Sequence, residues 1–304
     1  MIIVIGSLNI DLIATTPSLP RPGETVPGTD FSTAAGGKGA NQALAARRAG
    51  AEVRMAGAVG DDQFAAPALE LLDAANVDLS HVQHRPVPTG TALILVGGDG
   101  ENMITVIPGA NGTVTADMSR AALHGAGPGD TLLLQMEVPA TAIEAALVSA
   151  RAQGVRRILN IAPLSDDVTR LSALADIVVA NETEFERLSG KPACSAAEIR
   201  STLATLHAQR GQSLVVTLGA DGVMAAHQGL VIAVAAIPIK PVDTVGAGDT
   251  FCGYMAQGLD AGLNFEMALR RASVAGALAC LEPGAQPAIP LAAEVDLRLE
   301  AAGL

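Results

Sequence analysis

Residues 132–160 read LLLQMEVPATAIEAALVSARAQGVRRILN. Short apolar runs at 132–135 and 158–160 flank an alanine-rich segment at 140–153, which has the length and composition of a helix. A strand, a helix and a second strand in this order are the repeating unit of a wound parallel sheet. This stretch therefore predicts an α/β fold.

The same alternation continues in both directions along the chain. Further core strands are predicted at 2–5, 53–59, 177–180 and 214–218. Further helices are predicted at 39–49, 63–75, 182–189, 195–210, 247–259 and 265–281. The sequence contains no internal repeat and no low-complexity linker, so the pattern indicates a mostly parallel sheet covered by helices.

Two segments do not follow this alternation. Residues 12–34 contain short alternating runs around a Pro-Arg-Pro-Gly turn at 20–23, and residues 89–107 predict a hairpin that turns at 97–100. Together they are expected to form a small separate β-sheet. The alternative is that they are edge strands of the main sheet.

The composition is that of a folded protein with an acidic surface. Of the 304 residues, 49% are hydrophobic and 16% are charged, which excludes a disordered chain and suits two domains or one large α/β unit. The formal net charge of −12 argues against a broad nucleic-acid-binding surface. An anionic ligand would need a local device, such as a helix N-terminus or a Mg²⁺ ion.

The cysteines and the apolar segments bear on location. Cys194, Cys252 and Cys280 form no CxxC pair and no metal-like cluster with the histidines, and reduced, partly buried thiols fit a cytoplasmic protein. The N-terminal MIIVIGSLNID has no basic region and is expected to be a buried strand rather than a secretion signal. The longest apolar stretch, 230–239, is too short to span a membrane.

The first candidate motif is GGKGANQ at 36–42, which lies between a β-like segment and an alanine-rich helix. Glycines let the backbone approach a ligand closely, and the following helix offers unpaired N–H groups. The spacing is neither that of a P-loop nor GxGxxG. Lys38 and Asn41 beside a glycine turn suit recognition of hydroxyl groups better than phosphate, and an ordinary tight turn is the alternative.

The second candidate motif is DTVGAGDTF at 243–251, in which two carboxylates flank a Gly-x-Gly turn that opens a long helix. The glycine amides and the helix dipole would stabilise negative charge on a transferring phosphoryl group. Asp249 is expected in the first turn of that helix, where an isolated carboxylate can also be a plain helix-start residue. The combination of Asp243, two glycines and Asp249 favours function.

Polar residues also follow several predicted strands at the same end. They are Asn9, Asp11, Glu137, Asn160, the NETE segment at 181–184 and the TLGADG segment at 217–222. Ligands of open α/β sheets bind outside the carboxyl ends of the strands, so these residues are expected to face a ligand. Loop solvation and helix capping are the alternatives for any one of them.

Over essentially its whole length the chain resembles the ribokinase family of sugar kinases, the PfkB-type carbohydrate kinases. Residues 36–41 are similar to the family's first signature and residues 243–251 to its second. The members that phosphorylate ribose are matched further by GETV at 23–26, GGKGANQA at 36–43, Gln135-Met136-Glu137, Asn181-Glu182-Thr183-Glu184 and GAQP at 284–287. Asn160-Ile161-Ala162-Pro163 departs slightly from the usual Asn-Pro-Ala-Pro.

The resemblance implies a fold and an activity. The fold is a three-layer α/β sandwich with a mostly parallel central sheet and a small β-sheet lid. The activity is transfer of the γ-phosphoryl group of ATP to the 5-hydroxyl of D-ribose, with Mg²⁺ held mostly by ATP phosphates and water. The implied domain division places 1–11, 35–88 and 108–304 in the main domain and 12–34 and 89–107 in the lid, which often mediates homodimers.

The resemblance also implies roles for individual residues. Asp249 would be the catalytic base, and Gly246, Ala247 and Gly248 would form an anion hole. The implied sugar-binding residues are Asn9, Asp11, Gly37, Lys38, Asn41, Glu137 and Asp249. The implied ATP-site residues are Asn181, Thr217, Gly219, Gly222 and Ser273.

A monovalent-cation site is implied as well, because ribokinases are typically activated by K⁺. Its members would be the Asp243 carboxylate together with Val245, Ala279, Glu282 and Gly284 through their backbone carbonyls. An all-oxygen set of low net charge suits a large, weakly hydrated cation better than Mg²⁺. Ala288 stands where a serine is often found, so one polar contact is in doubt, and the simpler alternative is a helix that ends at Pro283-Gly284.

Three other functions fit the sequence less well. A kinase of another small sugar or of a nucleoside is the nearest alternative, and the scarcity of aromatic residues that could stack on a base argues mildly against the nucleoside. A sugar-binding regulator without catalysis would be expected to lack Asp249 or its glycine turn. A nicotinamide dehydrogenase would carry a glycine triplet where this chain has Gly6-Ser7-Leu8-Asn9.

Overall fold

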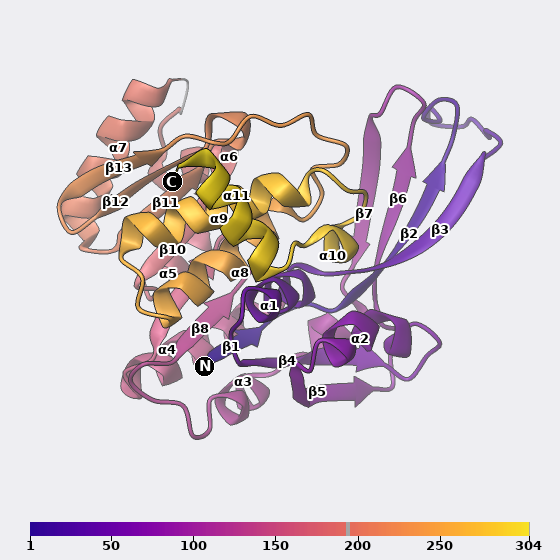
Figure 1. The fold of residues 1–304 in the computed structure, drawn as a ribbon. Helices are drawn as coiled ribbons and strands as arrows, with labels where there is room; N and C mark the ends of the chain where they lie inside the picture. The colour runs from indigo at the N-terminus through magenta and orange to yellow at the C-terminus, as the bar shows by residue number, and fades with distance from the viewer. Residues whose placement is uncertain (193–194, 304) are drawn as a thin grey trace.

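Within residues 1–192 and 195–303, which the computed structural model describes, nine strands form one large sheet (Figure 1). They are β1 (Ile2–Ile5), β4 (Val53–Gly60), β5 (Asp78–Arg85), β8 (Thr131–Leu134), β9 (Arg156–Asn160), β10 (Ile177–Asn181), β11 (Ser213–Thr217), β12 (Val223–His227) and β13 (Leu230–Val234). Their order is β13-β12-β11-β10-β9-β8-β1-β4-β5. All pairs from β11 to β5 are parallel, and β12 and β13 complete one edge as antiparallel strands.

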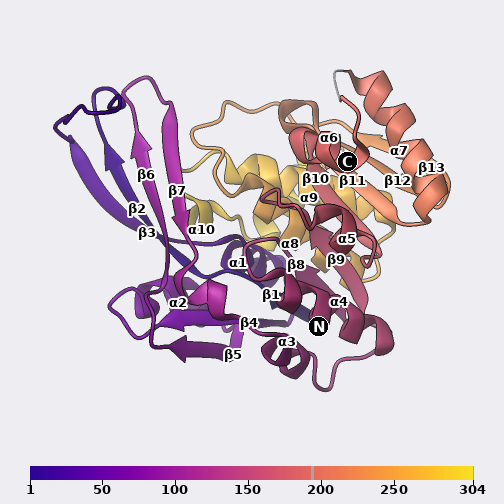
Figure 2. The same ribbon diagram turned by 180° about the vertical axis from the view of Figure 1, so that it is seen from behind.

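Helices cover both faces of this sheet and make the three layers that the resemblance implies (Figure 2). One face packs against α1 (Lys38–Arg48), α2 (Ala65–Ala74), α8 (Ala247–Asp260), α9 (Phe265–Ala279) and α11 (Ala292–Ala302). The other face packs against α3 (Ala116–Ala122), α4 (Ala140–Ala152), α5 (Val168–Ser172), α6 (Glu182–Ser189) and α7 (Ala196–Arg210). Ile2 and Val4 enter the first core and Ile3 and Ile5 the second, which explains the unbroken apolar runs.

The predicted strands and helices are confirmed, with bounds that differ by at most two residues. The polar edge strand β5 is not predicted, because it carries no apolar run. The β12–β13 hairpin is not predicted either. It turns through Gln228 and Gly229, whose φ values of 48° and 80° suit a type I′ turn, but glutamine is a weak signal for that turn.

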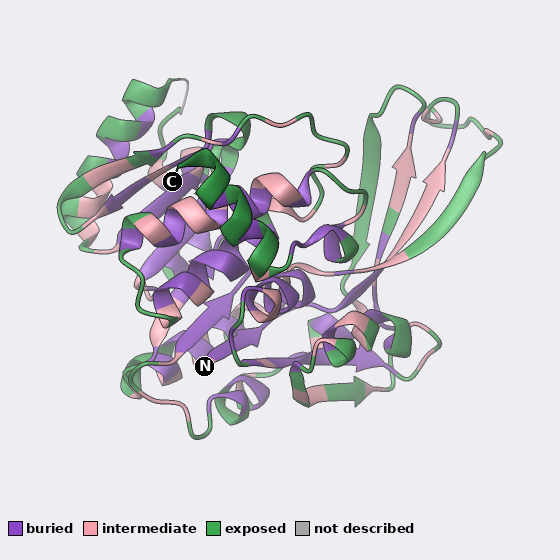
Figure 3. Cartoon of the chain, in the orientation of Figure 1, coloured by how far each residue is buried: buried purple, intermediate pink, exposed green. Residues whose placement is uncertain are grey.

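A separate four-stranded sheet contains β3 (Asp30–Gly36), β2 (Asn9–Thr15), β6 (Gly90–Val96) and β7 (Asn102–Ile107), in that order. This confirms the small sheet and its hairpin at 97–100, and the alternative of edge strands on the main sheet is wrong. The strands reach beyond the expected limits, since β2 begins at Asn9 and β3 ends at Gly36. Figure 3 shows this sheet largely half-buried or exposed beside the buried strands of the large sheet.

The small sheet stands at the carboxyl edge of the large one. The chain leaves β1, enters β2 after residues 6–8, and returns from β3 to α1 through Gly37. Gly37 has φ +91°, and a Cβ there would lie 2.9 Å from both Asn9 N and Ser7 O, so the crossing requires glycine. The two sheets therefore meet at the GGKGANQ segment.

Two further expectations concern the cysteines and membrane spans. Cys252 and Cys280 are buried and unpaired, as expected, whereas Cys194 lies outside the described residues. In the part of the chain that the structure describes, no helix combines the length and the apolar character that crossing a bilayer requires.

Candidate active site

The two glycine motifs meet at Asp249. This residue is 7% exposed and lies in the first turn of α8, as predicted. Its Oδ2 atom accepts a hydrogen bond from Asn41 Nδ2 at 2.9 Å, and its Oδ1 atom accepts one from Gln42 Nε2 at 2.9 Å. Both donors come from α1, so the carboxylate is oriented by the first motif and carried by the second.

The turn before Asp249 presents backbone amides. Gly246 caps α8 with φ +77°, and a Cβ on it would lie 2.9 Å from the Cα of Ala285, so the turn is shaped against α10 (Ala285–Ala288). Among the described residues, the amides of Gly248 and Asp249 have no acceptor. Gly248 is exposed and has open space where a Cβ would be. Unpaired amides at a helix N-terminus favour an anion.

Lys38 and Glu137 lie at the start of α1. A Glu137 Oε2 atom accepts hydrogen bonds from the Ser7 hydroxyl and, at 3.0 Å, from the Lys38 backbone amide. The Asp249 carboxylate raises the pKa of the Lys38 ammonium above its usual range and outweighs the opposite effect of burial. Lys38 therefore supplies positive charge among the carboxylates of this site.

Asp11 projects from the small sheet toward the same place. Both of its carboxylate oxygens would lie 2.5 Å from a Cβ on Gly36, so the glycine makes room for them. Burial, together with the charge of Glu137, raises the pKa of Asp11 to about 6. The Asp11 carboxylate of the small sheet and the Glu137 carboxylate, which follows β8, are thus close enough for their charges to interact.

Asn9 is held by a residue that the sequence analysis did not single out. Asn111 Nδ2 donates to Asn9 Oδ1 at 2.7 Å, and Asn111 also binds the backbone N–H and C=O of Leu8. Asn9 and Asn111 are 4% and 1% exposed. Asn111 lies in a short 3₁₀ helix, Gly109–Thr113, after the hairpin, and nothing in its local sequence marks it as a site residue.

Four of the five residues predicted for ATP lie at or just after the carboxyl ends of β10 and β11. Asn181 ends β10 and caps α6, exchanging bonds of 2.8 Å with Glu184. Thr217 ends β11, and the turn that follows has φ +53° at Gly219 and φ +97° at Gly222. A Cβ on Gly222 would lie 2.1 Å from Val234 O, so glycine is required there. Ser273 is half-buried on α9, and no hydrogen bond joins it to the other four among the described residues.

Hydrogen bonds join the two segments predicted for a monovalent cation, 243–245 and 279–284. Asp243 Oδ1 accepts from Val245 N at 3.0 Å, and its Oδ2 accepts from Gly284 N at 2.9 Å. The amide of Val242 donates to Cys280 O at 2.8 Å. The oxygen-only donor set fits such an ion, because each Asp243 oxygen accepts one hydrogen bond and keeps a lone pair for a cation. Across the described residues, no three His, Cys, Asp or Glu side chains gather as a metal site.

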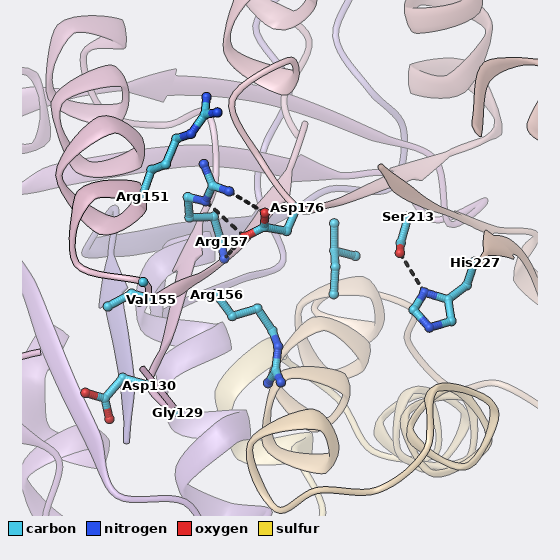
Figure 4. Close-up of a pocket in the computed structure, with 11 residues that line it drawn as sticks. Gly129, Asp130, Arg151, Val155, Arg156, Arg157, Asp176, Ser213 and His227 are labelled. Atoms are coloured by element: carbon cyan, nitrogen blue, oxygen red, sulfur yellow. Dashed lines mark hydrogen bonds and ion pairs between the residues drawn. The ribbon is translucent and has the colours of Figure 1, made fainter. Parts of the chain in front are cut away.

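Two cavities in the described part of the chain lie away from Asp249. One of about 470 Å³ opens at the amino ends of β8 to β11, where Figure 4 shows Arg157 paired with Asp176 and Ser213 beside His227. A second of about 450 Å³ lies between α9, α10 and α11 and includes Glu282. The predicted sugar and ATP residues line neither cavity. Most of them lie at the opposite, carboxyl edge of the sheet.

Comparisons with known proteins cover nearly the whole chain. A family model described as pfkB family carbohydrate kinase matches residues 1–292. The ribokinase of Bacillus subtilis is 37% identical over 298 residues, which are 97% of this chain and 98% of that protein. The deoxyribokinase of Salmonella typhimurium is 32% identical over 291 residues, 95% of each. The structure of Arabidopsis thaliana ribokinase complexed with ribose and ATP has a TM-score of 0.88 at 32% identity and covers 98% of this chain and 97% of that one.

Proposed function

The chain belongs to the pfkB family of carbohydrate kinases and is an ATP-dependent sugar kinase, and from this premise we propose that it phosphorylates D-ribose at the 5-hydroxyl. The observation that carries the proposal is the position of Asp249. This carboxylate lies beside the unpaired amides of the α8 turn and is oriented by Asn41 and Gln42 of the first motif. A base and an anion hole in adjacent residues suit phosphoryl transfer to a hydroxyl group.

The chemistry follows from this arrangement. Asp249 takes the proton from the attacking hydroxyl as the new oxygen–phosphorus bond forms, while the bond between the γ-phosphorus and the β–γ bridging oxygen breaks and ADP leaves. The turn of Gly246, Ala247 and Gly248 directs amides at the negative charge on the phosphoryl oxygens. Two hydrogen bonds hold the Asp249 carboxylate, so little reorganisation of the base would be needed in the transition state.

The sugar would lie between the two sheets. Asn9, Asp11 and Glu137 offer acceptors for its hydroxyl groups, because one carboxylate can accept from two hydroxyls. Gly37 and Asn41 complete the pocket at the start of α1, and Lys38 adds a donor. Glu137 also caps α1, which links sugar binding to the helix that orients Asp249.

ATP would lie along the carboxyl ends of β10 and β11. The glycine turn at 219–222 and the small side chains of Thr217 and Ser273 leave room for a base and a ribose, and Asn181 offers an amide at the start of α6. Mg²⁺ would be held mostly by ATP phosphates and water, and it would supply positive charge that the acidic chain lacks. A K⁺ ion at Asp243, Val245, Ala279, Glu282 and Gly284 would stiffen the anion-hole turn, and Ala288 leaves one polar contact in doubt.

The small sheet would act as a lid over the sugar, with the domain limits given above. Closure would exclude water, which otherwise competes as phosphoryl acceptor. The lid would also join two protomers into a homodimer, and the exposed apolar side chains of Phe31, Leu93 and Met103 support this. The buried, unpaired Cys252 and Cys280 support a cytoplasmic location.

The decisive experiment is a coupled ADP-release assay with Mg²⁺, ATP and a panel of pentoses, 2-deoxyribose, hexoses and nucleosides. We expect the highest kcat/KM with D-ribose. The second candidate is a kinase of another small sugar, which the similarity to a deoxyribokinase favours over a nucleoside kinase. Rapid turnover of another substrate while ribose fails would refute the ribose assignment and keep the kinase.

A further inference from the structure

Gln42 joins Asp249 to the ends of two central strands. It is completely buried on α1. Its Nε2 atom donates to Asp249 Oδ1 at 2.9 Å and to Asn160 Oδ1 at 3.2 Å, and its Oε1 atom accepts from Gln135 Nε2 at 2.7 Å. Gln135 follows β8 and Asn160 ends β9, so three elements converge on one amide.

The direction of the Gln42 amide follows from its partners. An amide has one accepting end and one donating end. Because the Asp249 carboxylate only accepts, the donating end of Gln42 points at Asp249 and its oxygen is left for the Gln135 donor. Gln135 is itself confined, since its Oε1 atom would lie 2.1 Å from a Cβ on Gly6 and the side chain is completely buried. Asn160 is fixed in turn by donating to Val179 O at 3.3 Å.

We propose that Gln42 is a positioning residue for Asp249, and that Gln135 acts on the reaction only through Gln42. This rests on the proposed role of Asp249 as the base. Asn41 alone leaves the carboxylate free to rotate about one hydrogen bond, whereas a second donor on Oδ1 fixes both oxygens. Gln135 hydrogen-bonds to no ionisable group among the described residues and is linked to Asp249 only through Gln42.

This arrangement has a kinetic consequence. Loss of the Gln42 amide leaves the other residues predicted for sugar and ATP in place but misorients the base, Asp249. Misplacement of a catalytic group by about 1 Å can cost about 10²-fold in rate. The effect should therefore fall on kcat and leave both KM values nearly unchanged.

The test is a double-mutant cycle measured on whichever sugar the wild-type enzyme turns over fastest. We expect Gln42→Met to lower kcat by about 10- to 100-fold, Gln135→Met to lower it less, and the double variant to equal Gln42→Met. Additive losses in the double variant, or a wild-type kcat in both single variants, would overturn the proposal. If Gln42→Met does not fold, Gln42→Asn serves, because the shorter amide cannot reach Gln135 and Asp249 together.

Two controls separate positioning from general destabilisation and from failure of the proposed base. Gln212 is a half-buried glutamine at the amino edge of the sheet whose amide donates to Ser172 O and Ala175 O. Gln212→Met should lower Tm and keep kcat, and a kcat loss equal to that of Gln42→Met would overturn the positioning role. If Asp249→Asn keeps its activity, both the role of Asp249 as the base and this inference are refuted. If Asp249→Asn is inactive while Gln42→Met and Gln135→Met are both fully active, only the inference is refuted.

Discussion

Asn41 Nδ2 donates a 2.9 Å hydrogen bond to Asp249 Oδ2 across 208 positions of sequence. The helices that carry the two residues are closely packed, because a Cβ on Gly253 of α8 would lie 2.5 Å from the Cβ of Ala45 on α1. The distance between the two motifs is therefore set by helix packing rather than by a loop. Sites held on rigid elements keep their geometry better than sites on loops.

The first prediction concerns Asp249. The Asp249→Asn substitution keeps the size of the side chain and removes its basicity, so kcat should fall by about 10²–10⁴-fold. Sugar binding, measured by calorimetry, should change far less. The control is Asp73→Asn, which changes an exposed carboxylate on α2. A variant that kept more than about a third of the wild-type kcat would contradict the role of a base, whose removal costs at least about 10²-fold.

The second prediction concerns sugar recognition by Asp11. The Asp11→Ala substitution removes acceptors for sugar hydroxyls at the junction of the two sheets, so KM for the sugar should rise strongly. KM for ATP should change little, since the predicted ATP residues lie at the ends of β10 and β11. Asp30→Ala changes an exposed carboxylate of the same small sheet and is the matched control. Equal effects on both KM values would indicate a folding role for Asp11 instead.

The third prediction is a pH dependence of stability. The folded state raises the pKa of Asp11 from its ordinary 3.8 to about 6, mainly through burial. Between these values the folded protein binds more protons than the unfolded chain, so rising pH lowers the free energy of unfolding. The loss is complete above about pH 6 and amounts to at most about 3 kcal/mol.

Replacement of Asp11 by asparagine should remove that loss. In urea titrations of the sugar-free protein, Asp11→Asn should therefore be more stable than the wild type at pH 8, and the difference should shrink toward zero by about pH 4. Asp30→Asn should show no such trend. A difference that stays constant with pH would mean that the charge of Asp11 is not the cause.

The sequence predicts the fold because its signals are local. The strands that enter both cores are continuous apolar runs, and the helices between them are alanine-rich. The small sheet is predicted because its two segments break that pattern. The elements that the sequence analysis missed have weak sequence signals. Examples are the polar strand β5 and the turn at Gln228 and Gly229.

The site is predicted less completely, because the residues that orient its side chains are distant in the sequence. Asp249 and its glycine turn are visible as one short motif. Gln135, Asn160 and Asn111 come from three separate segments, and each resembles an ordinary polar residue at a strand end or in a turn. The approach of α1 to the ends of β8 and β9 brings Gln135 and Asn160 to Gln42. Asn111 meets Asn9 where the segment after β7 returns to the start of β2.

The fourth prediction concerns the homodimer. Phe31, Leu95 and Met103 lie in one cross-strand row through Ala14, and Leu93 shares their face because side chains alternate along a strand. Asp11 points to the opposite face. Phe31 is 63% exposed and Met103 53%. Burial of this apolar face by a second copy would stabilise a dimer.

The double substitution Phe31→Lys/Met103→Lys should therefore shift the protein toward monomers in sedimentation velocity. Ile104→Lys is the matched control, because Ile104 is equally exposed on the same strand but lies on the face of Asp11. A wild-type monomer, or a dimer that survives the double substitution, would contradict the assignment of this face.

The fifth prediction concerns K⁺. Asp243 holds the loop before the anion hole to the segment at Gly284, and a bound cation would add ligands to both sides of that contact. A large, weakly hydrated ion tolerates an irregular set of carbonyl oxygens, whereas Mg²⁺ requires near-octahedral geometry.

We expect kcat at matched ionic strength to be higher in K⁺ than in Na⁺ or a bulky organic cation. Asp243→Ala should abolish the preference. Asp99→Ala should keep it, because Asp99 is an exposed carboxylate that accepts from the amide two residues on in the turn of the small sheet. Equal rates in the three salts would remove the cation from this site, and the Asp243 contacts would then serve only to fold the loop.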